Sequence, residues 1–287
     1  MSVRSFFGIR YASLENGQRF DLPVPVEAPS GLGRTSPYAQ TEDVPIFPQL
    51  PSRLSEHMGS PEGRYPQQED AFYLNVFIPE ETGPAPVMIF IHGGAWVSGA
   101  GTWNWYNGEA LADRGVVVVN VNYRIHASGL LNDGETHLPL EDLKLAIDWV
   151  HKNIHHFGGN PNSVTLVGQS AGGWYVHKLS QDPELRGKIH KVALLSMGTR
   201  TPWTRSYRDQ ILEDIAHQNF PRTTSELSPR ELMVSGLKAS VAINEHVNGT
   251  KQIGYAPSAL LPTVASNLDP SFLDPDVSAK NLVVDEV

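Results

Sequence analysis

Residues 164–173 read VTLVGQSAGG, and this stretch decides the fold of the chain. Its first four residues are β-branched or aliphatic, which is typical of a strand buried in a parallel sheet. A Gly-x-Ser-x-Gly turn follows at once, and residues 174–179 continue as a helix. We expect Gly168 and Gly172 to be required here, because a Cβ at either position would collide with the neighbouring strand or helix.

A strand, a tight turn and a helix in this order are typical of the nucleophile elbow of an α/β-hydrolase. Such a turn holds its serine at strained backbone angles. The strain pushes Ser170 out at the carboxyl edge of the sheet, where a substrate can reach the hydroxyl. A Gly-Ser turn that merely reverses the chain is the alternative, since five-residue matches arise by chance. The strand before the turn and the helix after it favour the elbow.

Composition limits the classes of function. The chain has 287 residues, of which 40% are hydrophobic, and this is enough to bury the core of one large domain. A formal net charge of -9 disfavours a nucleic-acid groove. The lack of cysteine excludes disulfides, thiolate metal sites and a cysteine nucleophile. Residues 1–8 lack the apolar core of a signal peptide and no window is long enough to span a membrane, so we expect a soluble, cytoplasmic protein without membrane or nucleic-acid partners.

The pattern of apolar residues predicts how the elements follow one another. Residues 1–80 are rich in Pro and Gly, which predicts antiparallel strands leading into a larger sheet and a surface course for residues 31–68. Strands are predicted at 4–11, 73–78, 87–91, 116–121 and 191–196, helices at 107–113, 139–157, 204–218 and 228–239, and loops at 128–136 and 247–279. Strands and helices alternate after residue 84, which predicts a doubly wound, mostly parallel sheet. We expect one α/β domain over 1–287, with the sheet core in 1–200 and a helical and loop segment, short at its end, in 201–287.

The strand at 87–91 runs directly into residues 92–96, HGGAW. Two adjacent glycines after a central strand let the backbone turn and present N–H groups to a ligand oxygen. On its own the motif could be a simple turn, but with the elbow downstream it predicts an oxyanion loop. We expect His92 to orient or support this loop rather than to act as a base, because it precedes the loop.

His151 and His155 lie four residues apart on the predicted helix at 139–157 and could in principle hold a metal ion. The zinc-protease pattern needs Glu after the first His, and Lys152 stands there instead. No third ligand is evident. Two solvated or capping histidines are therefore favoured over a metal site.

The sequence resembles the type B carboxylesterases, the esterase–lipase family that includes the cholinesterases and bacterial nitrobenzyl esterases. The motifs that carry the resemblance follow one another in family order over residues 6–198, at 8–12 (GIRYA), 19–20 (RF), 69–76 (EDAFYLNV), 91–96 (IHGGAW), 120–124 (NVNYR), 153–161 (NIHHFGGNP) and 168–173 (GQSAGG). Two departures stand out. Ala71 occupies a position where members with an N-terminal disulfide loop carry Cys, and the chain is much shorter than family members normally are.

The resemblance implies that Ser170 is the acyl-accepting nucleophile. It implies an oxyanion hole made by the backbone N–H groups of Gly94, Ala95 and Ala171, and it implies carboxylic esters as substrates, without a metal or a cofactor. Aromatic residues near these motifs in sequence either line an apolar substrate pocket or belong to the core; they are Trp96, Trp103, Trp105, Tyr106 and Trp174. Trp96 and Trp174 are the candidates for substrate binding.

The rest of the triad is incomplete in sequence. Ser170 needs a base to take its proton and a carboxylate to orient that base. Residues 281–286 resemble the strand that carries the family's acid, which makes Glu286 the candidate acid, although Val287 stands where Gly is expected. The histidines after Ser170 are His177, His190, His217 and His246, and none occupies the usual late position. His246 is the candidate for a displaced base.

Three function classes remain open. The first is an esterase for small apolar esters, with a rearranged base or with slow acyl transfer from Ser170 and the oxyanion hole alone. The second is a non-catalytic, esterase-like binding protein, although Ser170 is retained here. The third is a truncated member whose missing C-terminal portion, or a partner chain, supplies the base; its open sheet edge and exposed apolar surface would then favour homodimers or aggregation.

Overall fold

The computed structural model describes residues 3–34, 44–51, 64–80, 83–132, 134–197, 205–248 and 282–284. Its centre is a seven-stranded sheet with the order β1-β4-β6-β5-β7-β8-β9. The bounds are β1 Arg4–Arg10, β4 Tyr73–Ile78, β5 Ala85–Ile91, β6 Val117–Val121, β7 Gly159–Gln169, β8 Lys191–Leu195 and β9 Leu282–Val284. The first two pairings are antiparallel and those from β6 to β9 are parallel, so the predicted α/β-hydrolase sheet with antiparallel N-terminal strands is confirmed. Two short strands, β2 (Ala12–Ser13) and β3 (Val24–Pro25), pair separately.

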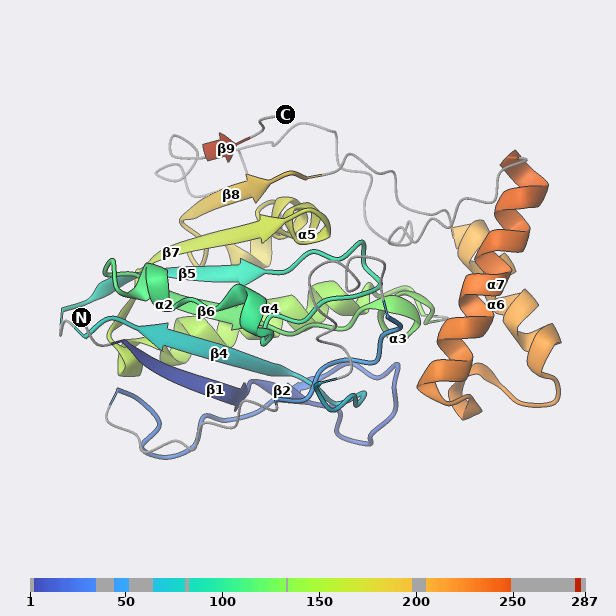
Figure 1. Cartoon of the computed structure of the whole chain (residues 1–287), viewed down its shortest axis with the longest axis horizontal. Helices are drawn as coiled ribbons and strands as arrows, with labels where there is room; N and C mark the ends of the chain where they lie inside the picture. Colours follow the sequence, from blue (N-terminus) through green and yellow to red (C-terminus); the bar gives the residue numbers. More distant parts are fainter. Residues whose placement is uncertain are drawn as a thin grey trace.

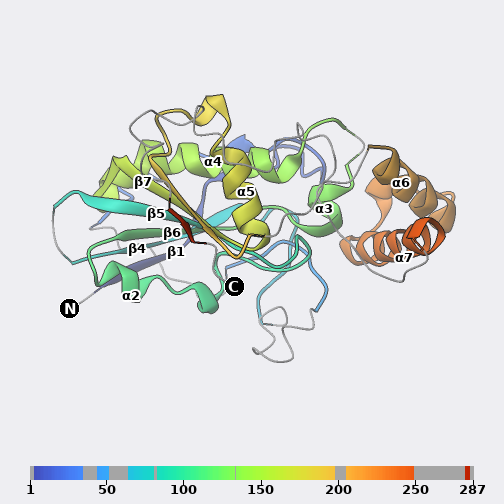
Figure 2. The same cartoon turned by 90° about the horizontal axis from the view of Figure 1, so that it is seen from above.

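Helices lie on both faces of the sheet and at its carboxyl edge. Their bounds are η2 Asn104–Tyr106, α2 Glu109–Ala112, α3 His126–Leu130, α4 Leu138–Asn153, η3 Ile154–Phe157, α5 Ala171–Leu179, η4 Pro183–Leu185, α6 Arg205–Asn219, η5 Thr224–Glu226 and α7 Pro229–Asn248. Helices α4 and α5 cover one face of the sheet and α2 lies on the other (Figure 2). The arrows of β5, β7 and β8 point toward α6 and α7, so this pair of helices flanks the carboxyl ends of the parallel strands (Figure 1).

The core forms where the sequence pattern places it. The strand residues that face α4 and α5 are fully buried, among them Ile89, Val119 and Leu166, and Leu143 and Ile147 of α4 pack against them. Gly158 adopts the left-handed conformation (φ 81°) after η3 and lets the chain turn into β7.

Two predicted loops, 128–136 and 31–68, are wrong in part. Residues 126–130 form α3, and all five are buried, because this helix is enclosed between the sheet core and α7. The segment 44–49 does not run over the surface; Val44, Ile46 and Phe47 are buried. Helix α7 also continues to Asn248, nine residues beyond the predicted end at 239.

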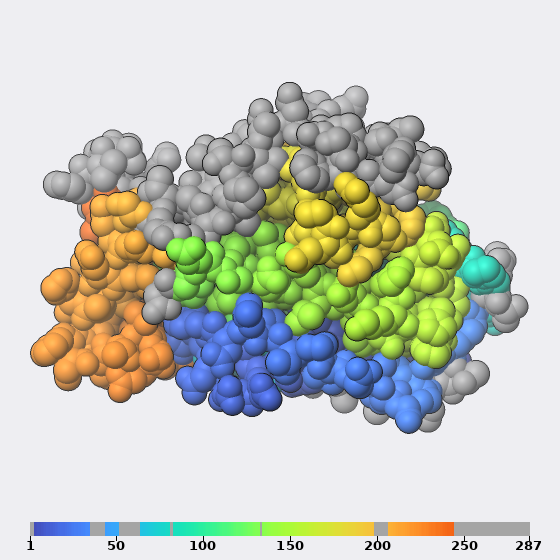
Figure 3. All heavy atoms as spheres, turned by 180° about the vertical axis from the view of Figure 1, so that it is seen from behind, coloured from blue at the N-terminus to red at the C-terminus, as the bar shows by residue number. Residues whose placement is uncertain are grey.

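The pair α6–α7, together with the turn that joins them, is called the hairpin below. It has its own apolar cluster, in which Ile211, Ile215 and Leu232 pack against Ala127 and Leu131 from α3 and the residue after it. Seen from behind, the hairpin (orange) forms one end of the molecule and adjoins the N-terminal segment (Figure 3). Arg19 makes this junction, because its guanidinium donates to the carbonyls of Thr224 and Leu227.

A buried ion pair joins the sheet to the helical layer. Arg124 follows β6 and Asp142 lies on α4; their side chains are 1% and 0% exposed, and Arg124 Nη2 donates to Asp142 Oδ1 at 2.5 Å. The second guanidinium nitrogen donates to the carbonyls of Arg19 and Asp21. Both terminal nitrogens of the Arg124 guanidinium are therefore hydrogen-bonded. A buried ion pair is tolerated when its polar atoms are satisfied in this way.

Replacement of Asp142 by Ala should lower the free energy of unfolding by about 3–5 kcal/mol, because it leaves the Arg124 charge buried without its partner. The measurement is urea unfolding followed by circular dichroism. Arg222→Gln, which breaks the exposed pair with Glu231, is the control and should cost no more than about 1 kcal/mol. Equal losses in the two variants would show that the buried pair does not hold the layers together.

Candidate active site

Ser170 lies on a strained turn between β7 and α5. Its backbone angles are φ 54° and ψ -119°, a combination that non-glycine residues rarely adopt and that persists only where the surroundings enforce it. Its N–H donates to the carbonyl of Leu195 at the end of β8 (2.8 Å), which fixes the turn to the sheet. A Cβ at Gly168 would collide with the Gly172 carbonyl, and a Cβ at Gly172 with the carbonyl of Ile91. The predicted requirement for glycine at both positions is confirmed.

The segment after β5 is folded against this turn. Gly94, Ala95 and Trp96 have consecutive positive φ values of 115°, 54° and 64°, so the backbone curls and exposes its N–H groups. A Cβ at Gly93 would lie 2.7 Å from the Gln169 carbonyl oxygen and 3.1 Å from Ser170 Cβ. The glycine pair therefore brings the two segments together.

Three backbone donors are available at this junction. Within the part of the chain that the structure describes, the N–H groups of Gly94, Ala95 and Ala171 donate to no other group. Ala171 is the first residue of α5, so its N–H has no intrahelical acceptor and lies at the positive end of the helix dipole. Such donors can stabilise a negative oxygen that develops beside Ser170.

His92 supports the loop and does not reach the nucleophile through any hydrogen bond in the described residues. It is fully buried, its ring stacks on Tyr123 with centroids 4.4 Å apart, and its Nδ1–H donates to the Gly93 carbonyl at 2.8 Å. Burial lowers the pKa of His92 to about 4. This agrees with the expected supporting role.

Sequence reasoning missed two contacts that hold residues 92–99, the segment after β5 that includes the predicted oxyanion loop. Buried Gln49 brackets Gly99: its Oε1 accepts from the Gly99 N–H (2.8 Å) and its Nε2 donates to the Gly99 carbonyl (3.2 Å). At the start of α3, the His126 N–H donates to the Trp96 carbonyl at 2.6 Å. Each bond joins segments that are distant in sequence, and neither residue type signals such a partner.

Trp96 and Trp174 are both buried, and their rings meet edge to face with centroids 6.2 Å apart, on the loop and the elbow helix respectively. They form an aromatic pair directly beside the junction, and their contact with substrate stays a prediction. Trp103 belongs instead to a separate core cluster with Ile46 and Tyr65.

No described histidine makes a hydrogen bond to the Ser170 hydroxyl; the side chain of His246 lies outside the described residues. His177 bonds Gln181, two residues beyond the end of α5, and His190 accepts the Val164 N–H near the start of β8, at the opposite end of that strand from Ser170. His217 lies in the last turn of α6. The base therefore stays undecided among the described residues, as the sequence left it.

The predicted acid follows a strand that the structure does contain. In β9, Val284 is in register with Leu195, whose carbonyl accepts the Ser170 N–H. The carboxyl end of β9 thus lies at the edge of the sheet that carries the elbow. Glu286 itself lies outside the described residues.

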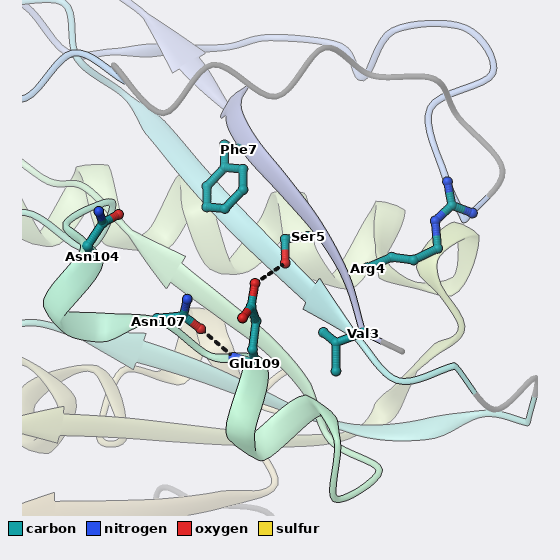
Figure 4. A pocket seen from close by; sticks show the side chains of 7 residues that line it. All are labelled: Val3, Arg4, Ser5, Phe7, Asn104, Asn107 and Glu109. Carbon is teal, nitrogen blue, oxygen red and sulfur yellow. Dashed lines mark hydrogen bonds between the residues drawn. The ribbon is translucent and has the colours of Figure 1, made fainter. Parts of the chain in front are cut away.

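A cavity of about 490 Å³ lies at the opposite edge of the sheet, beside the start of β1. Figure 4 shows two hydrogen bonds among its lining residues: Ser5 donates to Glu109 at 3.0 Å, and the Asn107 side chain accepts from the Glu109 backbone N–H at 2.8 Å. In open α/β sheets, ligands bind outside the carboxyl ends of the strands. We therefore place the candidate active site at Ser170 and not in this cavity.

Comparison with known proteins decides the family. The model of the carboxylesterase family matches residues 1–263. The chain belongs to this family. The solved structure titled "PNB esterase" superposes with a TM-score of 0.69 at 30% identity, and one titled "thermophylic PNB esterase" with a TM-score of 0.72 at 30% identity; each alignment covers 89% of this chain and 53% of the other.

Curated relatives give the same result. The chain is 37% identical over 219 residues to Acetylcholinesterase-1 of Trittame loki, covering 72% of this chain and 38% of the relative. It is 38% identical over 209 residues to para-nitrobenzyl esterase of Bacillus subtilis (strain 168), covering 69% and 41%. The chain thus spans about two fifths of the length of these relatives.

None of the helices in the described ranges is long and apolar enough to cross a membrane. The same residues contain no group of three or more His, Cys, Asp or Glu side chains that could hold a metal ion.

The buried histidines His92, His126 and His137 should stay neutral between about pH 5 and 8, because burial lowers their pKa values. Burial lowers the pKa of His126 to about 3, and burial with the nearby Arg124 charge lowers the pKa of His137 to about 3. The unfolded chain binds a proton at these positions below about pH 6.5 while the folded chain does not. Stability should therefore fall as pH drops from about 6.5 toward 4, and rise again as pH is restored.

The measurement is urea unfolding at several pH values, with histidine ring NMR alongside. The rings of His92, His126 and His137 should show no titration between about pH 5 and 8. A ring among these three that titrates near neutrality would contradict its burial and reopen it as a base.

Proposed function

We propose that this carboxylesterase-family protein hydrolyses small apolar carboxylic esters through an acyl-enzyme formed on Ser170. The observation that carries the proposal is the junction of a strained serine with a curled glycine loop, which leaves the N–H groups of Gly94, Ala95 and Ala171 unbonded beside it. That combination matches what acyl transfer needs: a nucleophile and preorganised donors for a developing oxyanion.

In the proposed reaction the Ser170 oxygen attacks the ester carbonyl as its proton passes to a base. The carbonyl oxygen becomes negative and accepts hydrogen bonds from the three backbone donors. The alcohol leaves with a proton, and water then releases the acid from Ser170. Glu286 is proposed as the acid that orients the base, because β9 brings the chain to the edge that carries Ser170. His246 is proposed as the base.

The burial pattern on one face of the sheet supports a second candidate function, in which a partner chain covers that face. Parallel sheets are normally buried on both faces. Here Ile89 and Leu194 are buried on the face covered by α4 and α5, whereas Met88, Phe90 and Leu195 on the other face are only partly buried. A partner polypeptide or a second copy that covers this face, and completes the triad, would explain the difference.

Intact mass after incubation with a fluorophosphonate tests the nucleophile. The protein should gain one adduct, and Ser170→Ala should gain none because the reactive hydroxyl is gone. Ser163→Ala, on the same strand, is the control and should label like the parent. A folded parent protein that takes up no adduct would overturn an activated Ser170 in the chain alone, and labelling that returns only in a dimeric fraction on size exclusion would support the second candidate.

Replacement of Gly93 by Ala tests the oxyanion loop. Its Cβ would push the loop away from Ser170 Cβ, so kcat for a p-nitrophenyl ester should fall about 100-fold or more, as when an oxyanion donor is lost. The far-ultraviolet circular dichroism spectrum should stay unchanged. Full activity in this variant would show that the loop does not form the oxyanion hole.

Replacement of Glu286 by Gln and of His246 by Ala tests the other two triad residues. Each should lower kcat about 10³-fold or more without loss of fold, since nucleophile and base act as a unit. His217→Ala is the matched control on the hairpin. If His246→Ala retains full activity while Ser170→Ala has none, a different residue is the base.

A further inference from the structure

A second cavity lies between the segment 44–51 and the start of α7. Its volume is about 390 Å³, within the size range of small-molecule sites. Leu50, Pro51, Pro229 and Met233 supply an apolar lining, and Arg230 is its charged residue. Neither the elbow nor the oxyanion loop contributes to it.

The positive charge of Arg230 beside the cavity favours a ligand with a negative head group. Arg230 forms no ion pair or side-chain hydrogen bond with any residue that the structure describes. Its neighbour Glu231 is engaged elsewhere, since it pairs with Arg222 at 2.9 Å and accepts from the Ser228 N–H and hydroxyl. A guanidinium beside an apolar cavity suits a carboxylate with an aliphatic tail, because it bonds both carboxylate oxygens while the tail leaves water.

We infer that this cavity is a binding site for amphiphilic carboxylates, with the head group on Arg230 and the tail against Met233 and Leu50. The chain carries a formal net charge of -9 and therefore repels anions in general. If an amphiphilic carboxylate binds this acidic chain saturably, a local positive group such as Arg230 must hold its head group.

One lining residue connects the cavity to the segment after β5. Gln49 lines the cavity and also brackets Gly99, three residues beyond the loop at 92–96, where a Cβ would collide with the His92 ring. A tail that displaces Gln49 alters the support of the loop, so occupancy should change kcat more than KM. This last step rests on the proposed function, whereas binding does not.

Methyl NMR of methionine-labelled protein, titrated with decanoate below its micelle concentration, tests the site. Met233 reports on the cavity, Met197 on the elbow, since it packs near Gly173, and Met88 on the sheet face. The Met233 methyl signal, which is assigned by its absence from the Met233→Leu variant, should shift saturably as decanoate is added. The Met197 signal should not shift at lower decanoate concentrations than the Met233 signal does. Arg230→Gln should raise Kd at least tenfold, and Arg186→Gln, an exposed arginine that does not line the cavity, should leave it unchanged within twofold.

The same titration contains the results that would overturn the site. They are no shift of Met233, equal affinity in Arg230→Gln, equal affinity for decanol, or a response of Met197 first, which would place decanoate at Ser170. If decanoate binds at Met233 but inhibits only by raising KM, the link through Gln49 is wrong and the site stands. If the protein binds decanoate yet hydrolyses no ester, the proposed function fails and the site stands.

Discussion

The close approach of Gly172 to the end of β5 is the constraint on which the rest of the site depends. The Ile91 carbonyl lies where a Cβ on residue 172 would be, so no side chain fits at this crossing. Because the elbow helix can press onto β5, the chain that leaves β5 at His92 and Gly93 starts beside Ser170. The strain at Ser170 and the curl at Gly94–Trp96 are held by this packing and by the bond from Ser170 to Leu195. Ser170 and the N–H groups of the loop after β5 are thus held in place by backbone packing against backbone.

A second layer of contacts supports that junction from the outside. The Arg124–Asp142 pair fixes the start of α4 against the end of β6 and holds the carbonyl of Arg19. Arg19 in turn fastens the turn between α6 and α7. Helix α3, which bonds the oxyanion loop through the His126 N–H, is packed between the core and this hairpin. The hairpin, α3 and the loop therefore form one connected body at the carboxyl edge, which gives residues far from Ser170 a physical route to influence it.

The family relation covers most of this chain but only part of its relatives. The chain aligns with the solved structure titled "PNB esterase" over 89% of its own length and 53% of the other chain. On the sheet face opposite α4 and α5, Val118 and Asn120 are buried, whereas Met88, Phe90 and Leu195 are only partly buried. Ser170 and the unbonded N–H groups of Gly94, Ala95 and Ala171 lie on two turns that meet at the end of β5 and β7, so this junction depends on few segments of the chain.

The sequence by itself determined the elements whose signal is local. The order of strands and helices, the glycines of the elbow and Ser170 follow from side-chain period and from steric limits at a tight turn, and both can be read over a few neighbouring residues. The tertiary structure alone decided the burial of α3 and of residues 44–49, the bracket of Gln49 around Gly99, and the core role of Trp103. These depend on contacts between segments distant in sequence, and no local pattern records which partner a buried amide, arginine or indole will meet. For the same reason the acid and the base stay predictions: Glu286 and the side chain of His246 lie outside the described residues, and only packing can bring them to Ser170.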